Sequence, residues 1–345
     1  MPKRIRDYGI EIGDLSPGKR NAITDVEGIS VGHVTLNDGQ VKTGVTAVLP
    51  HNGNVFREKV PAAVHVMNGF GKTIGTVQIE ELGTLETPIV MTNTLSVGTA
   101  ADALIDYMLE RNPEIGVTTG TVNPVVCECN DGYLNDIRGK HVKKEHVFEA
   151  LRQTTGDIIE GAVGAGTGMS CFGFKGGIGT ASRVVEIENH DYTLGVLLLS
   201  NFGRREDFLL DGKKAGKMIA KSEKSEPDKG SIIVIAATDV PMSEHQLKRV
   251  IKRSAVGIQR TGSFIGNGSG EIAIGFSTAA RIPHESRKAF IDIQRIHDAH
   301  MDLLFRAVAE STEEAILNSL VCAETTVGRE SHQRVSLKEY MHLLV

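Results

Sequence analysis

The hydrophobic and polar positions of the chain predict several short, buried strands. Each is a mostly apolar run bounded by glycine, polar or charged residues, a pattern typical of strands in a covered sheet. The clearest runs are Val45 to Leu49, Leu194 to Ser200, Ser231 to Ala237 and Glu271 to Ser277.

Other segments have the signals of helices. Ser243-Glu244-His245-Gln246 has the spacing of a capping box, and Leu247, Val250 and Ile251 then fall on one helix face. Serine is also a common N-cap residue, which places a helix start at Ser96. This second helix is predicted to run to about Arg111. A third predicted helix contains Leu304, Val308 and Ile316.

The order of these elements favours an α+β layered fold. Helices arrive in blocks and strands often come two together, whereas a parallel sheet needs strict alternation. Glycine is abundant at 38 residues, and its clusters at 161–179 and 262–275 contain apolar residues, which indicates tight turns and close backbone contacts. The 345 residues are enough for one large domain or two smaller ones, and the only convincing linker is 211–230.

An abrupt change in polarity occurs at Gly230-Ser231. The charged run 221–229 precedes it and the apolar strand 232–237 follows it. A serine at this point is fixed by the strand while its hydroxyl still reaches the sheet edge. If the Gly230–Ser231 bond were cut, Ser231 would also carry a free amine of pKa about 7.7–8.0, able to serve as its own base. Position alone favours an ordinary loop-to-strand junction.

Composition narrows the classes of function. The net charge is −5 with dispersed basic residues, aromatic content is 5% and tryptophan is absent, so a nucleic-acid-binding face is not expected. The N-terminus has no apolar core of a secretory signal, and no run approaches the roughly 18–20 apolar residues of a membrane span. We therefore expect a soluble, cytoplasmic protein without a membrane partner.

Metal and nucleotide sites are not predicted. His297 and His300 lack further ligands nearby, and the spacing of Cys127 and Cys129 is not that of a zinc motif. The cysteines are too few for a disulfide scaffold and are expected to be buried thiols. Two glycine motifs resemble parts of phosphate-binding loops, but Val66 and Met169 stand where each needs a glycine. No cofactor is expected. The four cysteines are Cys127, Cys129, Cys171 and Cys322.

Four polar residues occupy unusual apolar or glycine-rich surroundings. Asn201 ends an apolar run, where its amide could donate to an oxyanion. Ser269 and Glu271 flank Gly270 and, being two apart on an extended chain, would point to the same side. Glu128 lies between two cysteines, a poor place for an unpaired charge. Taken singly, these residues are better explained without a function: Asn201 as a turn residue, Ser269 and Glu271 as a solvated loop, and Glu128 as a surface acid.

A family resemblance joins these positions. In order along the chain, eight segments resemble the DmpA-type peptidases, a family that contains L-aminopeptidase/D-Ala-esterase-amidases and β-peptidyl aminopeptidases. These segments are Ile5 to Ile10, Asn21 to Gly28, Leu85 to Ile89, Thr92 to Thr94, Gly161 to Arg183, Asn201 to Arg205, Ala237 to Pro241 and Gly268 to Glu271.

The resemblance implies a fold and a processing event. The fold is a four-layer αββα sandwich similar to N-terminal-nucleophile hydrolases, with a connectivity shared with ornithine acetyltransferases. The whole chain would form one domain, cut into 1–230 and 231–345. The scissile bond would be Gly230-Ser231, and four processed pairs would assemble into a homotetramer.

The resemblance also implies roles for the candidate residues. Ser231 matches the nucleophile, Ser269 and Glu271 match residues that contact it, and Asn201 matches the oxyanion donor. Glu128 matches the acid that binds the free amino group of the substrate. One position departs from the pattern, because Asn130 stands where some members have tyrosine. Tyr133 lies nearby and is a candidate to replace that phenol.

The function that follows is a metal-independent serine aminopeptidase acting on small peptides, amides or esters. Two other classes stay open. An acyltransferase of the ornithine acetyltransferase type would use the same acyl-enzyme, although its nucleophile is typically threonine. A non-enzymatic small-molecule binder would keep the scaffold and lose the nucleophile.

Overall fold

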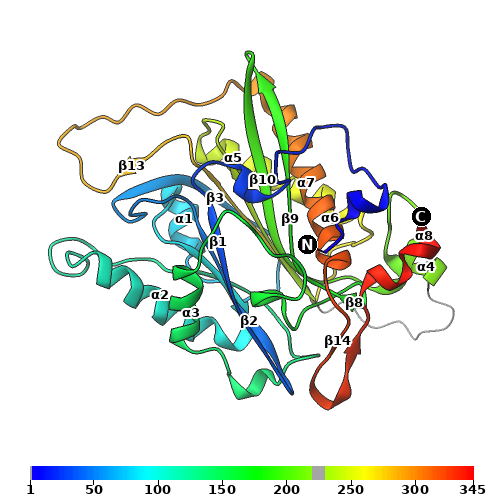
Figure 1. Ribbon diagram of the computed structural model, residues 1–345. Helices are drawn as coiled ribbons and strands as arrows, with labels where there is room; N and C mark the ends of the chain where they lie inside the picture. Colours follow the sequence, from blue (N-terminus) through cyan, green and yellow to red (C-terminus); the bar gives the residue numbers. More distant parts are fainter. Residues whose placement is uncertain (1, 220–229) are drawn as a thin grey trace.

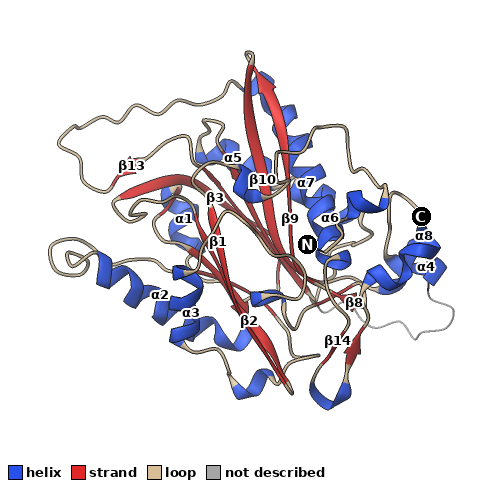
Figure 2. Ribbon diagram, viewed as in Figure 1, coloured by secondary structure: helices blue, strands red, loops and turns tan. Residues whose placement is uncertain are grey.

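A computed structural model describes residues 2–219 and 230–345 of the chain. Two β-sheets lie face to face, and the longer helices cover their outer sides (Figures 1 and 2). The α+β class expected from the sequence is confirmed.

The first sheet has four strands in the order β1-β2-β5-β6. Pairs β1–β2 and β2–β5 are antiparallel, and β5–β6 is parallel. Apolar residues of α2 and α3 pack on its outer face. The bounds are β1 Ser30–Asp38, β2 Val41–Leu49, β5 Ile89–Asn93, β6 Val125–Cys129, α2 Val97–Arg111 and α3 Lys144–Arg152.

The second sheet is larger and runs in the order β13-β3-β12-β11-β10-β9, with β4 paired to β3. Its only parallel pair in the described chain is β11–β12. Helices α5 and α7 cover its outer face, and α6 packs against α7. The bounds are β3 Glu58–Gly69, β4 Thr84–Leu85, β9 Gly177–Ile187, β10 His190–Asn201, β11 Ser231–Thr238, β12 Gly270–Ser277, β13 Ile282–Pro283, α5 Glu244–Ile251, α6 Ser254–Arg260 and α7 Met301–Val321.

Short elements connect these layers. The α-helices and strands are α1 Thr76–Leu82, α4 Ala215–Ile219, α8 Met341–Leu344, β7 Ser170–Cys171, β8 Phe174–Lys175, β14 Thr326–Val327 and β15 Gln333–Arg334. The 3₁₀ helices are Ile5–Tyr8, Ile23–Asp25, Thr94–Ser96, Ile137–Gly139, Gly164–Gly166, Arg205–Asp207, Asp298–His300, Arg329–Ser331 and Leu337–Tyr340.

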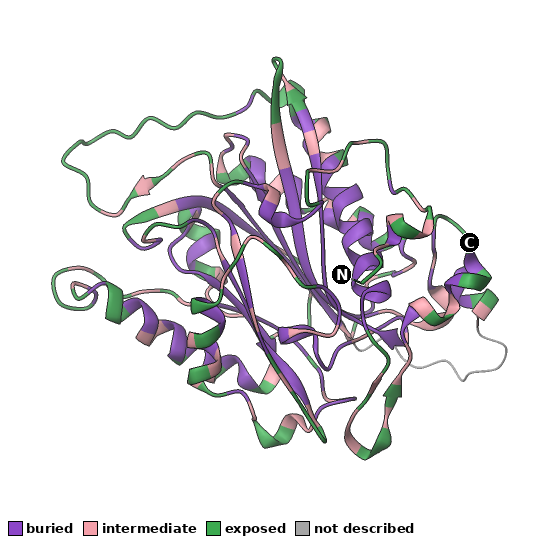
Figure 3. Cartoon of the chain, in the orientation of Figure 1, coloured by how far each residue is buried: buried purple, intermediate pink, exposed green. Residues whose placement is uncertain are grey.

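Three apolar cores separate the four layers. The central core joins Val48 and Met91 of the first sheet to Leu197 and Ile233 of the second. The two outer cores lie between each sheet and its own helices. The strands of the second sheet and α7 are therefore largely buried (Figure 3). This burial on both faces explains why strands such as β11 have continuous apolar runs in the sequence.

Local sequence signals were correct for most elements and wrong in two details. The capping box at Ser243 forms, because Ser243 Oγ accepts a hydrogen bond from the backbone of Gln246. Ser96 holds the N-cap position of α2 but makes no capping hydrogen bond with its side chain. The segment 211–230 is not simply a linker, because 215–219 form α4 and Ala215 is fully buried. Residues 220–229 lie outside the described chain.

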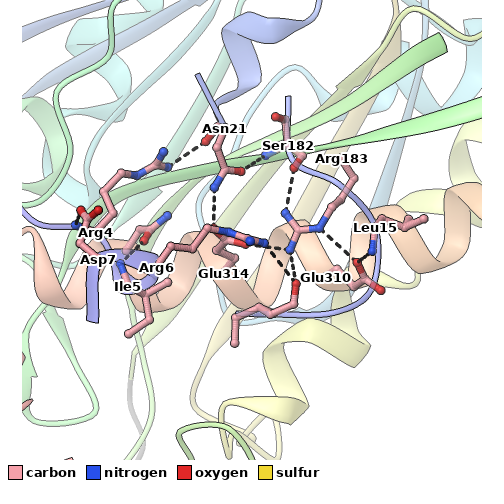
Figure 4. A network of polar contacts seen from close by, with 12 residues as sticks. Arg4, Ile5, Arg6, Asp7, Leu15, Asn21, Ser182, Arg183, Glu310 and Glu314 are labelled. Carbon is pink, nitrogen blue, oxygen red and sulfur yellow. Dashed lines mark hydrogen bonds and ion pairs between the residues drawn. The ribbon is translucent and has the colours of Figure 1, made fainter. Parts of the chain in front are cut away.

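A buried ionic network fastens the N-terminal segment to α7 (Figure 4). Arg183 of β9 forms ion pairs with Glu310 and Glu314 of α7 at 3.1 and 2.7 Å. Arg6 forms a further ion pair with Glu314 at 2.7 Å, and the side-chain amide of Asn21 donates to the same carboxylate. The network therefore joins three regions that are far apart in the sequence.

Candidate active site

Ser231 begins β11, the strand between β10 and β12. Its register partners are Asn201, the last residue of β10, and Gly270, the first residue of β12. The ends of three adjacent strands therefore bring together three of the segments that the sequence singled out. Ser231 is 5% exposed, so its position is fixed by the sheet while it keeps a small contact with solvent.

The backbone of Gly230 lies tightly against the end of β10. A Cβ atom at position 230 would stand 2.0 Å from the carbonyl oxygen of Asn201 and 2.5 Å from Cα of Phe202. Only glycine fits there without a shift of the backbone. The carbonyl oxygen of Gly230 accepts a hydrogen bond from the Gly270 N–H at 3.2 Å, which holds and polarises the carbonyl before Ser231.

Ser269 and Glu271 are both fully buried. The hydroxyl of Ser269 has no hydrogen-bond partner among the described residues, and its carbonyl accepts from the Asn68 side chain. The strand register shifts between Glu271 and Ile272, so the end of β12 is irregular at this point. The interpretation of Ser269 and Glu271 as a solvated loop is wrong.

Asn201 is held at both ends of its amide. Its Oδ1 accepts from the Ser170 N–H at 2.9 Å, and its Nδ2 donates to the carbonyl of Asn130 at 3.0 Å. The side chain is 7% exposed and belongs to a strand. The interpretation of Asn201 as a turn residue is therefore wrong.

Glu128 lies on β6 of the first sheet and is 2% exposed. One carboxylate oxygen accepts from the Lys72 N–H at 2.8 Å, and the other accepts from the hydroxyl of Thr94. Those two donors are neutral, so the described contacts give this acid hydrogen bonds but no ion pair. A surface position for Glu128 is excluded.

Glu128 and β12 both lie against Gly71, because a Cβ atom at position 71 would stand 3.8 Å from Glu128 Oε1 and 3.3 Å from Ile272 Cδ1. Burial raises the pKa of the Cys129 thiol well above its ordinary value, and the charges of Glu128, Cys127 and Glu271 add to this effect. Its thiol donates to the carbonyl of Leu199 on β10 at 3.6 Å. The candidate residues from both sheets therefore share one region.

The position of Asn130 differs in character from the other candidates. Its side chain is exposed, and Oδ1 accepts from the Gly132 N–H at 2.9 Å. Tyr133 stacks on His332 with ring centroids 4.6 Å apart, and the Arg334 guanidinium lies 3.7 Å from the tyrosine ring centroid. The phenol ring is thus packed against the hairpin β14–β15, and a role in place of the missing tyrosine stays a prediction.

Sequence reasoning missed the partners of these residues. Thr94 lay in a recognised segment without an assigned role, and Lys72 acts through its backbone, which the sequence does not reveal. Lys175 is fully buried within the glycine-rich segment, where a single cation among apolar residues was an available signal.

The other sequence expectations concern metals, thiols and membranes. All four cysteines are free and buried, as predicted. No group of three or more potential metal ligands occurs among residues 2–219 and 230–345, and His297 instead caps a 3₁₀ helix. In the same part of the chain, every helix is too short or too polar to cross a bilayer.

Comparison with known proteins identifies the family. The model of peptidase family S58 matches residues 21–334. The chain belongs to this family. The resemblance to DmpA-type peptidases is thereby confirmed, and the protein is a hydrolase.

Similar proteins cover almost the whole chain. A β-peptidyl aminopeptidase, BapA of Sphingosinicella microcystinivorans, is 42% identical over 99% of this chain and 93% of its own. A crystal structure from Pyrococcus horikoshii OT3 is 54% identical with a TM-score of 0.95, covering 99% of this chain and 98% of that one. The L-aminopeptidase D-Ala-esterase/amidase of Ochrobactrum anthropi is 37% identical with a TM-score of 0.90 over 99% of each chain. That structure is described as a variant of the N-terminal-nucleophile hydrolase fold, and this chain shares the fold.

Proposed function

We propose that this S58 peptidase is a self-processing serine aminopeptidase that works through an acyl-enzyme on Ser231. One observation carries the proposal: the register places Ser231 beside Asn201 on one side and beside Gly270 on the other. A nucleophile, an oxyanion donor and a buried acid then come from three adjacent strands. The names of the relatives support the same activity.

Maturation would divide the chain into 1–230 and 231–345. Ser231 Oγ attacks the Gly230 carbonyl carbon, the C–N bond breaks, and the hydroxyl proton ends on the released amine. Water then hydrolyses the ester to give a Gly230 carboxylate and restores the hydroxyl. The missing side chain at Gly230 and the Gly270 N–H on its carbonyl oxygen support this attack.

Turnover would use the same oxygen and the new amine. The Ser231 amine accepts the Oγ proton as Oγ attacks the substrate carbonyl, and it then delivers that proton to the leaving nitrogen. Asn201 Nδ2 donates to the oxyanion, while Ser269 and Glu271 hold the amine. Water releases the acyl group in the second half of the reaction.

Glu128 would select the substrate by its free amino group. Its carboxylate has only neutral donors among the described residues, so an arriving ammonium supplies the missing opposite charge. Small peptides, amino-acid amides and esters with an unblocked amine are the proposed substrates. Relatives named for β-peptides and for L-amino acids are both similar to this chain, so the proposal includes both classes.

Three further expectations accompany this function. The peptidase family favours hydrolysis over the acyltransferase and the non-enzymatic binder. A homotetramer of processed pairs is proposed from the family resemblance, and its test is the mass in solution before and after processing. A cytoplasmic location is proposed from the sequence and is tested by cell fractionation.

Replacing the nucleophile tests the proposed function. Ser231→Ala should abolish both chain cleavage and hydrolysis, whereas Ser231→Cys keeps a nucleophile and should retain some cleavage. Ser277→Ala is the matched control, because Ser277 is a buried serine at the other end of β12. Normal hydrolysis by Ser231→Ala would show that Ser231 is not the nucleophile.

A further inference from the structure

Lys175, in β8, is fully buried and surrounded by main-chain carbonyls. Its Nζ lies 2.9 Å from the oxygen of Gly166, 2.9 Å from that of Met169 and 2.6 Å from that of Gly176. A carbonyl oxygen only accepts hydrogen bonds, so three such contacts require three N–H donors. The side chain is therefore an ammonium in this structure.

The charge of Lys175 has a second support in Asp131. Burial lowers the pKa of Lys175 to about 7, and the charges of Asp131 and then Cys171 act in the opposite direction. Asp131 is itself fully buried and lies against the loop, since a Cβ at Gly168 would stand 2.8 Å from Asp131 Cβ. Asp131 directly follows Asn130, the residue whose carbonyl accepts from Asn201.

One peptide unit connects Lys175 to the candidate oxyanion donor. The Met169 carbonyl that Lys175 contacts belongs to the same peptide as the Ser170 N–H, which donates to Asn201 Oδ1 at 2.9 Å. A cation at the carbonyl end of a peptide polarises the unit and strengthens its N–H as a donor. The ammonium thus acts on Asn201 through a continuous chain of hydrogen bonds.

The neighbours of Asn201 also fix which end of its amide faces the nucleophile. The Ser170 N–H only donates, so the atom opposite it is Oδ1; the Asn130 carbonyl only accepts, so the atom opposite it is Nδ2. Among the described residues, one of the two Nδ2 hydrogens is engaged. The second Nδ2 hydrogen can donate to the negative charge that develops on the oxygen of a substrate carbonyl.

We propose that Lys175 is a positioning residue of this peptidase, whose ammonium holds the Met169–Ser170 peptide and thereby orients and polarises the Asn201 amide toward the oxyanion. The inference rests on the proposed function, because Asn201 affects catalysis in this way only if it is the oxyanion donor. Lys175 itself does not touch the substrate.

A substitution that keeps size and removes charge tests the proposal. Lys175→Gln should lower kcat by about 10- to 100-fold, less than the loss of a whole oxyanion donor, while KM changes little. Thr167→Val is the matched control, since the Thr167 hydroxyl is buried in the same loop and bonds only Gly164 among the described residues. This variant should keep the wild-type kcat.

A double-mutant cycle separates positioning from a general structural role. In the Asn201→Ala background, Lys175→Gln should have almost no further effect on kcat, because its action passes through the missing amide. An equal loss in both backgrounds would overturn the proposal. The unfolding midpoints of wild type, the two single variants and the double variant establish that all four are folded under the assay conditions.

The pH dependence supplies a measurement that needs no substitution at Lys175. The ammonium is present below its pKa and lost above it, so the ratio of kcat between wild type and Asn201→Ala should fall as pH rises from roughly 6 to 10. Burial raises the pKa of the Asp131 carboxyl, which acts on Lys175, to about 7, so Asp131 titrates in the same range. Asp131, Cys171 and the Ser231 amine are present in both proteins, so their direct effects cancel in the ratio. A ratio independent of pH would contradict the proposal.

Failure of this inference is distinguishable from failure of the proposed function. If Ser231→Ala is inactive and Lys175→Gln acts independently of Asn201, only the role of Lys175 is wrong. If Ser231→Ala is active, the nucleophile itself is wrong.

Discussion

Two buried polar clusters of this protein differ in how completely their groups are satisfied. Around Arg183, cations meet carboxylates, and the guanidinium also donates to the carbonyls of Ile12 and Ser182. Around Ser231, the Ser269 hydroxyl lacks a partner among the described residues, and the Asn201 amide uses one of its two hydrogens. The first cluster is complete at rest, whereas the second keeps hydrogen-bonding capacity for a reacting group.

The pKa of Glu314 shows that its negative charge is well compensated in the first cluster. Burial alone would raise the pKa of its carboxyl, but hydrogen bonds from Arg6 and the charge of Arg183 outweigh burial and lower it. Glu314 belongs to 231–345, while Arg6 and Arg183 belong to 1–230. The network would therefore hold the two parts together after a cut at Gly230–Ser231.

Breaking the complete cluster should have the largest effect on stability. Arg183→Met leaves two buried carboxylates without their shared cation and should cost about 3–5 kcal/mol of unfolding free energy. Urea unfolding measures the loss, and activity per folded molecule should stay near wild type. Arg306→Met is the control, because the Arg306–Asp14 ion pair also involves α7 but has side chains that are 56% and 83% exposed. Equal losses in the two variants would remove the distinction between the clusters.

Removing a group from the incomplete cluster should lower catalytic activity strongly and change stability little. Asn201→Ala is expected to lower kcat roughly 10²- to 10³-fold with little change in unfolding free energy, the size typical of one lost oxyanion donor. Steady-state kinetics beside urea unfolding separates the two quantities. A change confined to KM would instead make Asn201 a residue that positions the substrate.

The smallest expected effect concerns selectivity. Wild type should hydrolyse an aminoacyl p-nitroanilide far better than its N-acetyl analogue if Glu128 binds the free ammonium of the substrate, as proposed. Glu128→Gln should reduce this discrimination while chemistry at Ser231 continues. The ratio of kcat/KM for the two substrates, in wild type and variant, gives the result. Equal hydrolysis of both by wild type would favour a general amidase or esterase over an aminopeptidase.

The same contrast explains how much the sequence could predict. Apolar runs identified β10, β11 and β12, and a capping box identified α5, because those signals are local. Pairings between distant segments depend on the packed fold, and no local pattern reveals them. The sheet order and the contact between Glu128 and the Lys72 backbone are of this kind.

The candidate site was likewise only partly accessible. Ser231, Asn201 and Glu128 were found because polar residues interrupted apolar or glycine-rich stretches, and the family resemblance joined them. Ser170 contacts Asn201 through its main-chain N–H, and the Lys175 side chain contacts main-chain carbonyls, so both contacts depend on a loop geometry that side-chain identity does not specify. The catalytic and binding roles of all the candidate residues stay predictions: Ser231, Asn201, Ser269, Glu271, Glu128 and Asn130.

The intact mass of the purified protein under denaturing conditions tests the central claim most directly. The account predicts two polypeptides, 1–230 and 231–345, the second beginning with a free serine amine, and a single uncut chain for Ser231→Ala. An enzyme that is fully active while the whole population stays uncut would contradict the account, because Ser231 would then have no amine to serve as its base.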